Sequence, residues 1–270
     1  MGADIKQLRT RIKSVDSTLH LTEAMGLVAS SKMRKSNEAM LRAREYEGAV
    51  QSTVSMLTAC NECKKSPYMA KRDTKRTRLI VIAGDRGLAG GYNANVFRLV
   101  KELTDAVDAD IIPIGKRSHD RFGGTLLYTE GFGYEEAKEL STRLCEDFAE
   151  GKFDCLGIVC TRYHSMMSQE AVVRYVLPLE ASEADSRTGA IFEPDEVTVL
   201  NAAIPEYLAG ILVSCAKESF ASEVAARRFA MDAAGKNARE MLNDLGLAYN
   251  RARQGAITQE ITEIVAGSGM

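Results

Sequence analysis

Tryptophan is missing from this 270-residue sequence, and aromatic residues make up only 6% of it. Globular cores usually draw on aromatic side chains, so this composition favours helices that pack through aliphatic residues. Proline is scarce as well, and none occurs before Pro67. Because proline is the residue that most strongly interrupts a helix, one long helix can occupy the chain up to that region.

Long hydrophobic runs and strong net charge are absent too. The longest uncharged apolar run, near residues 208–216, is much shorter than the about 20 residues needed to cross a bilayer, so we expect no direct membrane span. The formal net charge of −2 argues against a nucleic-acid partner. Residues 1–37 are locally basic, with seven Lys or Arg against three acids, and this stretch could face an acidic partner.

Metal-binding side chains are few and scattered. The three histidines, His20, His119 and His164, share no metal-like spacing, and Cys60 and Cys63 form a single C-x-x-C pair without a second. We therefore expect no metal site and no cofactor. No leader-like segment precedes the first helix, so we expect a reducing compartment and six free cysteines.

Both ends of the sequence carry a helical apolar pattern. Residues 5, 8, 12, 15 and 19 are all aliphatic and follow the 3–4 spacing of a heptad seam, which predicts a helix over about 4–57, roughly 80 Å long. A second pattern runs from Pro205, which suits a first helical turn, to Val265. Long helices must bury such seams, so we expect the two to form an antiparallel coiled coil, with the longer C-terminal helix extending beyond the other.

Between these helices the pattern changes to alternating strands and helices. We predict strands over 78–84, 108–115, 154–165 and 170–179, the last of them at a sheet edge. Helices are expected after an N-cap at Asn93, over 116–124 and over 134–153, and residues 125–133 are either an edge strand or a loop. The fold class is therefore α/β, with a Rossmann-like domain inserted between the coiled-coil helices. The predicted domains are 1–63, 76–200 and 205–270.

The stretch AGDRGLAGGYN, residues 83–93, lies between a predicted strand and a predicted helix. Glycine loops of this kind can cradle phosphate. This one lacks the G-x-G-x-x-G spacing, and no Walker sequence occurs, so a structural turn is favoured over a nucleotide site. Asp85 and Arg86 would stand exposed at the carboxyl end of a strand, where α/β folds place contacts. The basic run SKMRK, residues 31–35, is either a solvated helix face or a partner contact.

Three stretches together resemble the gamma subunit of F-type ATP synthases. They are IKQLRTRIKSVDSTLHLTEAMGLVASSKMRK (5–35), DRGLAGGYNANVF (85–97) and the region 225–265, which ends in ITQEITEIV. The resemblance implies the central rotor shaft, a non-catalytic subunit. It would couple ion flow through the membrane c ring to ATP synthesis or hydrolysis on the beta subunits, and regulate the ATPase activity of the complex. The implied partners are three alpha and three beta subunits, the epsilon subunit and the c ring, and the implied location is the cytoplasmic side of the cell membrane, peripherally.

The resemblance also implies subunit contacts. Met25 matches a methionine near an acidic loop of beta, and Arg253 and Gln254 match a pair that grips a loop of beta. The other matching positions are a basic stretch (Lys32, Arg34, Lys35), a foot-domain loop (Asp85, Arg86, Gly87) and polar positions of the last helix (Thr258, Glu260, Glu263). The apolar stripe formed by Ile257, Ile261, Ile264 and Val265 is expected to pack on the N-terminal helix and on a bearing in the alpha–beta ring.

Four positions depart from the family pattern. Glu23 stands where a basic residue is usual, Gly26 where a larger residue is usual, and Gly255 and Ala256 where Ala-Ser is frequent. Two rival readings of the residues are a non-rotary coiled-coil scaffold and a nucleotide-binding α/β enzyme with helical arms.

Overall fold

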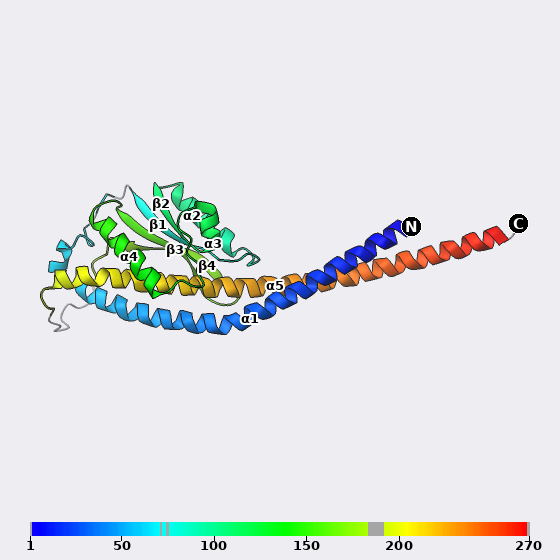
Figure 1. Ribbon diagram of the computed structural model, residues 1–270, viewed down its shortest axis with the longest axis horizontal. Coiled ribbons are helices and arrows are strands. Elements are labelled where there is room, and N and C mark those ends of the chain that lie inside the picture. The colour runs from blue at the N-terminus through cyan, green and yellow to red at the C-terminus, as the bar shows by residue number, and fades with distance from the viewer. Residues whose placement is uncertain (1, 71, 74–75, 183–191, 269–270) are drawn as a thin grey trace. The chain divides into compact units, whose positions relative to one another are not determined.

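The computed structural model describes residues 2–70, 72–73, 76–182 and 192–268. They fall into two compact units. Unit 1 contains the described residues up to Ser30 and those from Arg227 onward, and unit 2 is Ser31–Ala226. Two long helices, α1 (Gly2–Thr58) and α5 (Glu196–Ser268), contribute to both units (Figure 1).

Unit 1 is a pair of antiparallel helical segments. Glu23 of α1 is paired with Arg239 of α5, and further along α1 the Gly26 carbonyl accepts a hydrogen bond from Arg228. Residue numbers therefore rise on one helix as they fall on the other, as the predicted coiled coil requires. Gly235 of α5 faces α1 across the seam: an added Cβ atom there would lie 3.5 Å from Thr22 Oγ1, an ordinary van der Waals contact.

The C-terminal end of α5 continues past the start of α1 within unit 1 (Figure 1). Its apolar stripe is not covered by α1, because Ile257, Ile261, Ile264 and Val265 are 47%, 56%, 69% and 64% exposed. The expectation that this stripe packs on the N-terminal helix is therefore wrong. The last positions of this helix face that are still partly covered are Tyr249, Ala252 and Ala256. Beyond them α5 extends past the start of α1, which begins at Gly2.

Unit 2 is built on a four-stranded mixed sheet with the order β2-β1-β3-β4. Strand β1 (Thr77–Ile82) pairs in parallel with β2 (Ala109–Ile114) and β3 (Cys155–Tyr163). Strand β4 (Gln169–Leu177) is antiparallel to β3 and lies at the edge, as predicted. The remaining elements are the short 3-10 helix η1 (Glu62–Lys65) and the helices α2 (Tyr92–Thr104), α3 (Lys116–Phe122) and α4 (Tyr134–Ala149). Residues 125–133 form a loop, one of the two alternatives considered.

Alternate residues of the central strands feed two cores, one on each face of the sheet. Ile80 and Ile158 pack with α4, α5 and the end of α1. Leu79 and Val159 lie on the opposite face and pack with α2. This alternation follows from the two-residue period of a strand, and it buries the sheet on both faces, as parallel strands require.

Helix α5 begins at Glu196, so the expectation that Pro205 opens it is wrong. Two features support the earlier start. The Asp195 carboxylate accepts hydrogen bonds from the Thr198 N–H and hydroxyl at 2.9 and 2.8 Å, which caps the helix. Leu200 and Ile204 are fully buried, and burying two such side chains offsets the about 3 kcal/mol cost of an interior proline.

Helix α5 is also the one described helix that is long and apolar enough to cross a membrane by length and composition. More than half of its apolar window, 56%, is buried inside the protein. Core helices of globular proteins pass the same test, and α5 contributes several buried side chains to the core of unit 2, among them Leu200, Ile204 and Leu208. We therefore assign the segment to the core of unit 2.

Candidate functional site

The loop between β1 and α2 is held by hydrogen bonds to its own backbone and side chains. The Asp85 carboxylate accepts hydrogen bonds from the backbone N–H groups of Lys116, Thr129 and Glu130 at 3.2, 2.9 and 2.8 Å. Asp85 is thus half-buried and fastens the start of α3 to the 125–133 loop, contrary to the expected exposure. Arg86 is exposed as expected, with 62% of its side chain accessible.

Glu223 of α5 lies directly beneath this loop. Its side chain is buried, and its two oxygens accept hydrogen bonds from the backbone N–H groups of Asp85 and Arg86 at 3.2 and 3.1 Å. Adjacent backbone N–H groups of this kind bind phosphate in nucleotide-binding loops. Here a carboxylate of the chain itself takes that place, which gives a physical reason for preferring a structural turn.

The glycines of the loop allow this close packing. A Cβ atom at Gly84 would lie 2.8 Å from the Glu223 side chain, and one at Gly87 would lie 2.9 Å from the Arg117 guanidinium. The predicted N-cap is wrong: α2 begins at Tyr92, and the Asn93 side chain instead accepts a hydrogen bond from the Gly84 N–H at 2.9 Å. Asn93 therefore serves the loop and not the helix end.

Glu130 brings two of the predicted contact residues together. Its carboxylate lies 2.5 Å from Lys32 Nζ of α1 and 3.7 Å from Arg86 Nη2. The other two basic residues of the run, Arg34 and Lys35, are exposed. Arg34 is 91% accessible and stands 3.9 Å from Glu38, which is a weak surface pair. The basic run is thus divided between one residue tied to the loop and two that face solvent.

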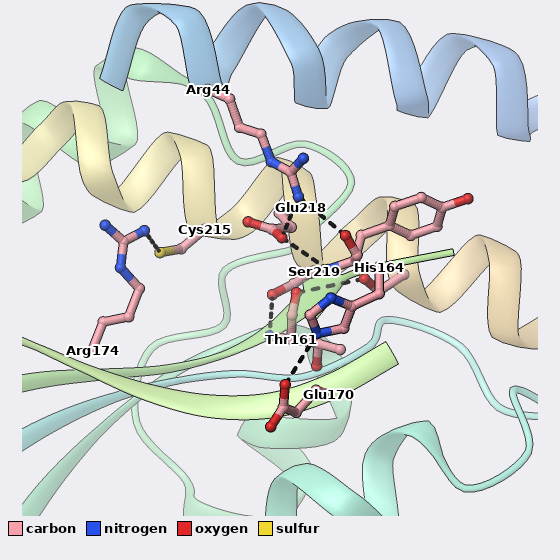
Figure 2. Close-up of polar contacts among 10 residues, drawn as sticks. Arg44, Thr161, His164, Glu170, Arg174, Cys215, Glu218 and Ser219 are labelled. Atoms are coloured by element: carbon pink, nitrogen blue, oxygen red, sulfur yellow. Dashed lines mark hydrogen bonds and ion pairs between the residues drawn. The ribbon is translucent and has the colours of Figure 1, made fainter. Parts of the chain in front are cut away.

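A second polar network joins α1, α5 and the sheet in unit 2 (Figure 2). Glu218 of α5 accepts hydrogen bonds from the Arg44 side chain at 2.6 Å and from the Tyr163 N–H at 2.8 Å. Beside it, the Ser219 hydroxyl accepts a hydrogen bond from the Thr161 N–H at 3.0 Å. Arg174 of β4 is paired with Glu47 of α1 and lies 3.4 Å from Cys215 Sγ.

Sequence reasoning missed this network and the role of Glu223. A signal was present: two glutamates, Glu218 and Glu223, interrupt the most apolar part of the C-terminal helix. Carboxylates are seldom fully buried unless hydrogen bonds or cations satisfy them. Charged residues in such a stretch therefore indicate internal partners, although the pattern does not reveal which partners they are.

The predicted contact residues of unit 1 are exposed, with the exception of Met25. Met25 is half-buried beside the seam, and the unusual Glu23 is matched by Arg239 of α5 at 2.5 Å. Gly26 is buried, and a Cβ atom there would make only ordinary contacts, 3.7 Å from Met231. The polar residues of the last helix, Arg253, Gln254, Thr258, Glu260 and Glu263, are all exposed on α5.

The cysteines belong to no metal-binding group in the part of the chain that the structure describes. Within the described ranges no cluster of three or more His, Cys, Asp or Glu side chains could hold a metal ion. Cys63 is fully buried, and burial together with the nearby Cys60 and acidic groups raises its pKa to about 11. A thiol held in its neutral form is a poor metal ligand and a poor nucleophile.

A family model and two solved structures identify the class of protein to which this chain belongs. A family model described as ATP synthase matches residues 4–269. In solved structures, a chain of the Euglena gracilis mitochondrial ATP synthase (OSCP/F1/c-ring) has a TM-score of 0.71 at 19% identity and covers 98% of this chain and 94% of its own. A chain of the Tetrahymena thermophila central stalk and c ring has a TM-score of 0.63 at 22% identity, over 79% and 99%. These likenesses establish the fold, an α/β domain with two long terminal helices.

The curated relatives are more specific. ATP synthase gamma chains from Ruminococcus albus and Heliobacterium modesticaldum are 41% and 36% identical, each covering 98% of both chains. The sodium ion specific gamma chain of Acetobacterium woodii is 36% identical over 99% of both. The chain therefore belongs to the ATP synthase gamma chain family. It is a non-catalytic rotor subunit, and the resemblance found in the sequence is confirmed.

Proposed function

We propose that this chain is the central shaft of an F-type ATP synthase, peripheral to the membrane on its cytoplasmic side. It would turn with the c ring and couple ion flow to ATP synthesis or hydrolysis on beta. The observation that carries this proposal is the antiparallel pairing of chain ends in unit 1, together with family membership over residues 4–269. The three segments 1–63, 76–200 and 205–270 remain our proposed division of the chain into shaft, foot and shaft.

A shaft of this kind acts because its different faces make different contacts with the subunits that surround it. A partner changes the conformation of a protein only when it binds one conformation more favourably than another. The two faces of the last helix differ: Ile257, Ile261 and Ile264 form an apolar stripe, whereas Arg253 and Glu260 are charged and exposed. Three otherwise identical beta subunits around such a helix would each meet a different surface.

We propose that unit 1 contacts the alpha and beta subunits through Met25, Arg253, Gln254, Thr258, Glu260 and Glu263. The support is their exposure or partial exposure. Arg253 has no ion-pair partner among the residues that the structure describes, so its charge is available to another subunit. The apolar stripe would then be covered by a hydrophobic surface of the alpha–beta ring and not by α1.

We propose that unit 2 contributes its contacts through Lys32, Arg34, Lys35 and Arg86, with epsilon and the c ring as further partners of this unit. Asp85 and Gly87 have a different proposed role. The Asp85 carboxylate accepts hydrogen bonds from three backbone N–H groups. The missing side chain at Gly87 leaves space for the Arg117 guanidinium. Both would position Arg86 and leave the contact itself to that side chain.

The test is co-expression with cognate alpha and beta subunits, with and without this chain. We expect a complex with one copy of this chain per three alpha–beta pairs, and an ATPase activity that depends on it. If alpha and beta assemble and turn over equally well without the chain, the rotor proposal fails and a coiled-coil scaffold becomes the better description. Saturable ATP binding to the isolated chain would instead favour an enzyme.

A further inference from the structure

One lysine of unit 2, Lys217 of α5, lines a surface cavity of about 490 Å³. Helix α1 contributes Arg42 and Tyr46 to the same cavity, and α4 contributes Tyr134. The two tyrosines are 44% and 38% exposed, so the cavity is open to solvent at its rim. A small molecule dissolved in water can therefore reach the Lys217 side chain, although the residue itself is half-buried.

The amine of Lys217 is held in a fixed position by a neutral partner. Its Nζ donates a hydrogen bond to the Phe132 carbonyl at 2.6 Å. A carbonyl accepts this bond equally from an ammonium group and from a neutral amine, whereas a carboxylate would favour the ammonium form. When Nζ is neutral it keeps this hydrogen bond and still has a lone pair with which to attack an electrophile.

The surroundings of Lys217 favour the neutral, nucleophilic form more than those of a neighbouring lysine do. Burial lowers the pKa of Lys217 below its usual 10.5, and the charge of Glu136 does not overcome this effect. Lys138 of α4 shows the opposite case, because a hydrogen bond with Glu206 raises its pKa. A lysine removed from water, or placed beside another cation, is a recognised form of activated nucleophile.

Arg42 gives the same cavity a positive charge that can attract an anion. It is exposed and has no ion-pair partner in the part of the chain that the structure describes. The carboxylates that act on groups of this cavity have other partners: Glu206 is paired with Lys138 at 3.0 Å, and Glu136 accepts a hydrogen bond from the Gly133 N–H at 3.0 Å. The planar guanidinium group matches the oxygen geometry of a phosphate.

We propose that Lys217 is an acylation site, that the acyl donor is a small acyl phosphate, and that Arg42 binds the phosphate of this donor. The neutral Nζ attacks the carbonyl carbon of the donor, so that a C–N bond forms and the C–O bond to phosphate breaks. Phosphate leaves with the bonding electron pair, and the nitrogen releases one proton to water. The product is a neutral amide that can still donate its N–H to the Phe132 carbonyl, so acylation removes one positive charge and keeps this contact.

The test compares lysines within one sample of the folded, full-length chain. The chain is treated with acetyl phosphate, and the acetylated fraction of each lysine is followed over time by peptide mass spectrometry. We expect Lys217 to be acetylated faster than Lys101, which is exposed on α2, and Lys138 to be slower than both. In urea the order should disappear, because the fold creates it. The proposal is wrong if Lys217 reacts no faster than Lys101 in the folded chain, or if its lead persists in urea.

Arg42 variants test the choice of donor. With acetyl phosphate, Arg42→Ala should slow the acetylation of Lys217 about two- to fivefold, the range for an exposed charge pair, whereas Arg42→Lys should retain most of the rate. With an uncharged acetyl ester of N-hydroxysuccinimide, Arg42→Ala should have little effect, and Lys101 serves as the internal standard throughout. No slowing with acetyl phosphate, or equal slowing with both donors, would overturn the role of Arg42. Because the chain is tested alone, these outcomes do not depend on its proposed function as a rotor shaft.

Discussion

Arg44 Nη2 of α1 lies 2.6 Å from Glu218 Oε1 of α5, and the same oxygen accepts a hydrogen bond from the Tyr163 N–H of β3. One carboxylate oxygen thereby connects both long helices to the sheet within unit 2. The Glu218 side chain is 10% accessible and that of Arg44 is 38% accessible. The pair is thus shielded enough to matter, unlike the surface pairs of α1.

Removing the cation should destabilise unit 2. In Arg44→Met the buried Glu218 carboxylate keeps the Tyr163 N–H but loses its counter-ion, and we expect the free energy of unfolding in urea to fall by about 1–3 kcal/mol. The control is Lys65→Met, which breaks the exposed pair with Glu62 and should change the free energy of unfolding far less, because water screens the pair. Equal effects of the two substitutions would show that the Arg44–Glu218 pair contributes no more than a surface contact.

Glu223 should control the loop that presents Arg86. In Glu223→Ala the partly buried N–H groups of Asp85 and Arg86 lose their acceptor, at a cost of up to about 1–3 kcal/mol for each group that water does not reach. We expect their amide hydrogens to exchange with solvent at least about tenfold faster, since 1.4 kcal/mol corresponds to a factor of ten. Glu223→Gln keeps one acceptor oxygen and should give an intermediate rate. Unchanged protection in Glu223→Ala would contradict the role assigned to this residue.

Two glycines of unit 2 should respond to alanine in opposite directions. Gly48 is exposed in the middle of α1, and a Cβ atom there has open space around it. Gly48→Ala should therefore raise the free energy of unfolding by about 0.5–1 kcal/mol. At Gly157 of β3 the Cβ atom would lie 2.9 Å from the buried Leu79 side chain, so Gly157→Ala should lower it by about 1–3 kcal/mol. Thermal unfolding of both variants beside the unsubstituted chain measures the difference, and equal signs would contradict the packing described here.

The sequence predicted those parts of the fold that depend on local periodicity. The heptad spacing around Leu19 and the apolar run of β1 each identify an element directly, because the buried face repeats with the helix or strand. The start of α5 was mispredicted because Pro205 is a strong local signal, while the burial of Leu200 and Ile204 is a tertiary effect. Tertiary packing overrides local propensity in such cases.

The candidate site was predicted unevenly for a similar reason. The family motif identified Arg86, whose accessibility follows from its place after a strand. The hydrogen bonds of Asp85 and Glu223 join segments far apart in sequence: Glu223 lies 137 positions from Arg86. Residue spacing carries no information about pairings over such a separation. For the same reason the match between Glu23 and Arg239 was not foreseen.

Acid should weaken the ion-pair cluster around Asp147 of α4. Its carboxylate lies 2.6 Å from Lys152 Nζ and 2.5 Å from Arg78 Nη1, and hydrogen bonds from first Lys152 and then Arg78 lower its pKa below the usual 3.8. A lowered pKa in the folded state contributes stability above the unfolded pKa, and this contribution is lost as the pH falls through the folded value. The stability deficit of Asp147→Asn should therefore be largest near neutral pH and shrink below pH 3.8. Urea unfolding across this range measures it.

The control for this pH dependence is Asp244→Asn in unit 1. Asp244 is exposed and has no ion-pair partner among the described residues, so its substitution should change stability little at any pH. A deficit of Asp147→Asn that stays constant between neutral and acidic pH would mean that the neutral asparagine fails for a steric reason. The charge of Asp147 would then not be the cause.

Substituting Arg253 and Gln254 should affect the function of the complex without affecting the stability of this chain. Both side chains are exposed on α5, so Arg253→Ala combined with Gln254→Ala should change the free energy of unfolding by no more than about 0.5 kcal/mol. If they grip beta, the double variant should lower ATP synthesis in membranes about tenfold, as loss of an arginine anchor does in other interfaces. Asn250→Ala with Arg251→Ala removes the same two kinds of side chain from exposed positions one helical turn earlier and should have little effect. If both variants keep the free energy of unfolding of the unsubstituted chain, a difference in synthesis between them arises from contacts outside this chain, and equal synthesis would remove Arg253 and Gln254 from the proposed interface.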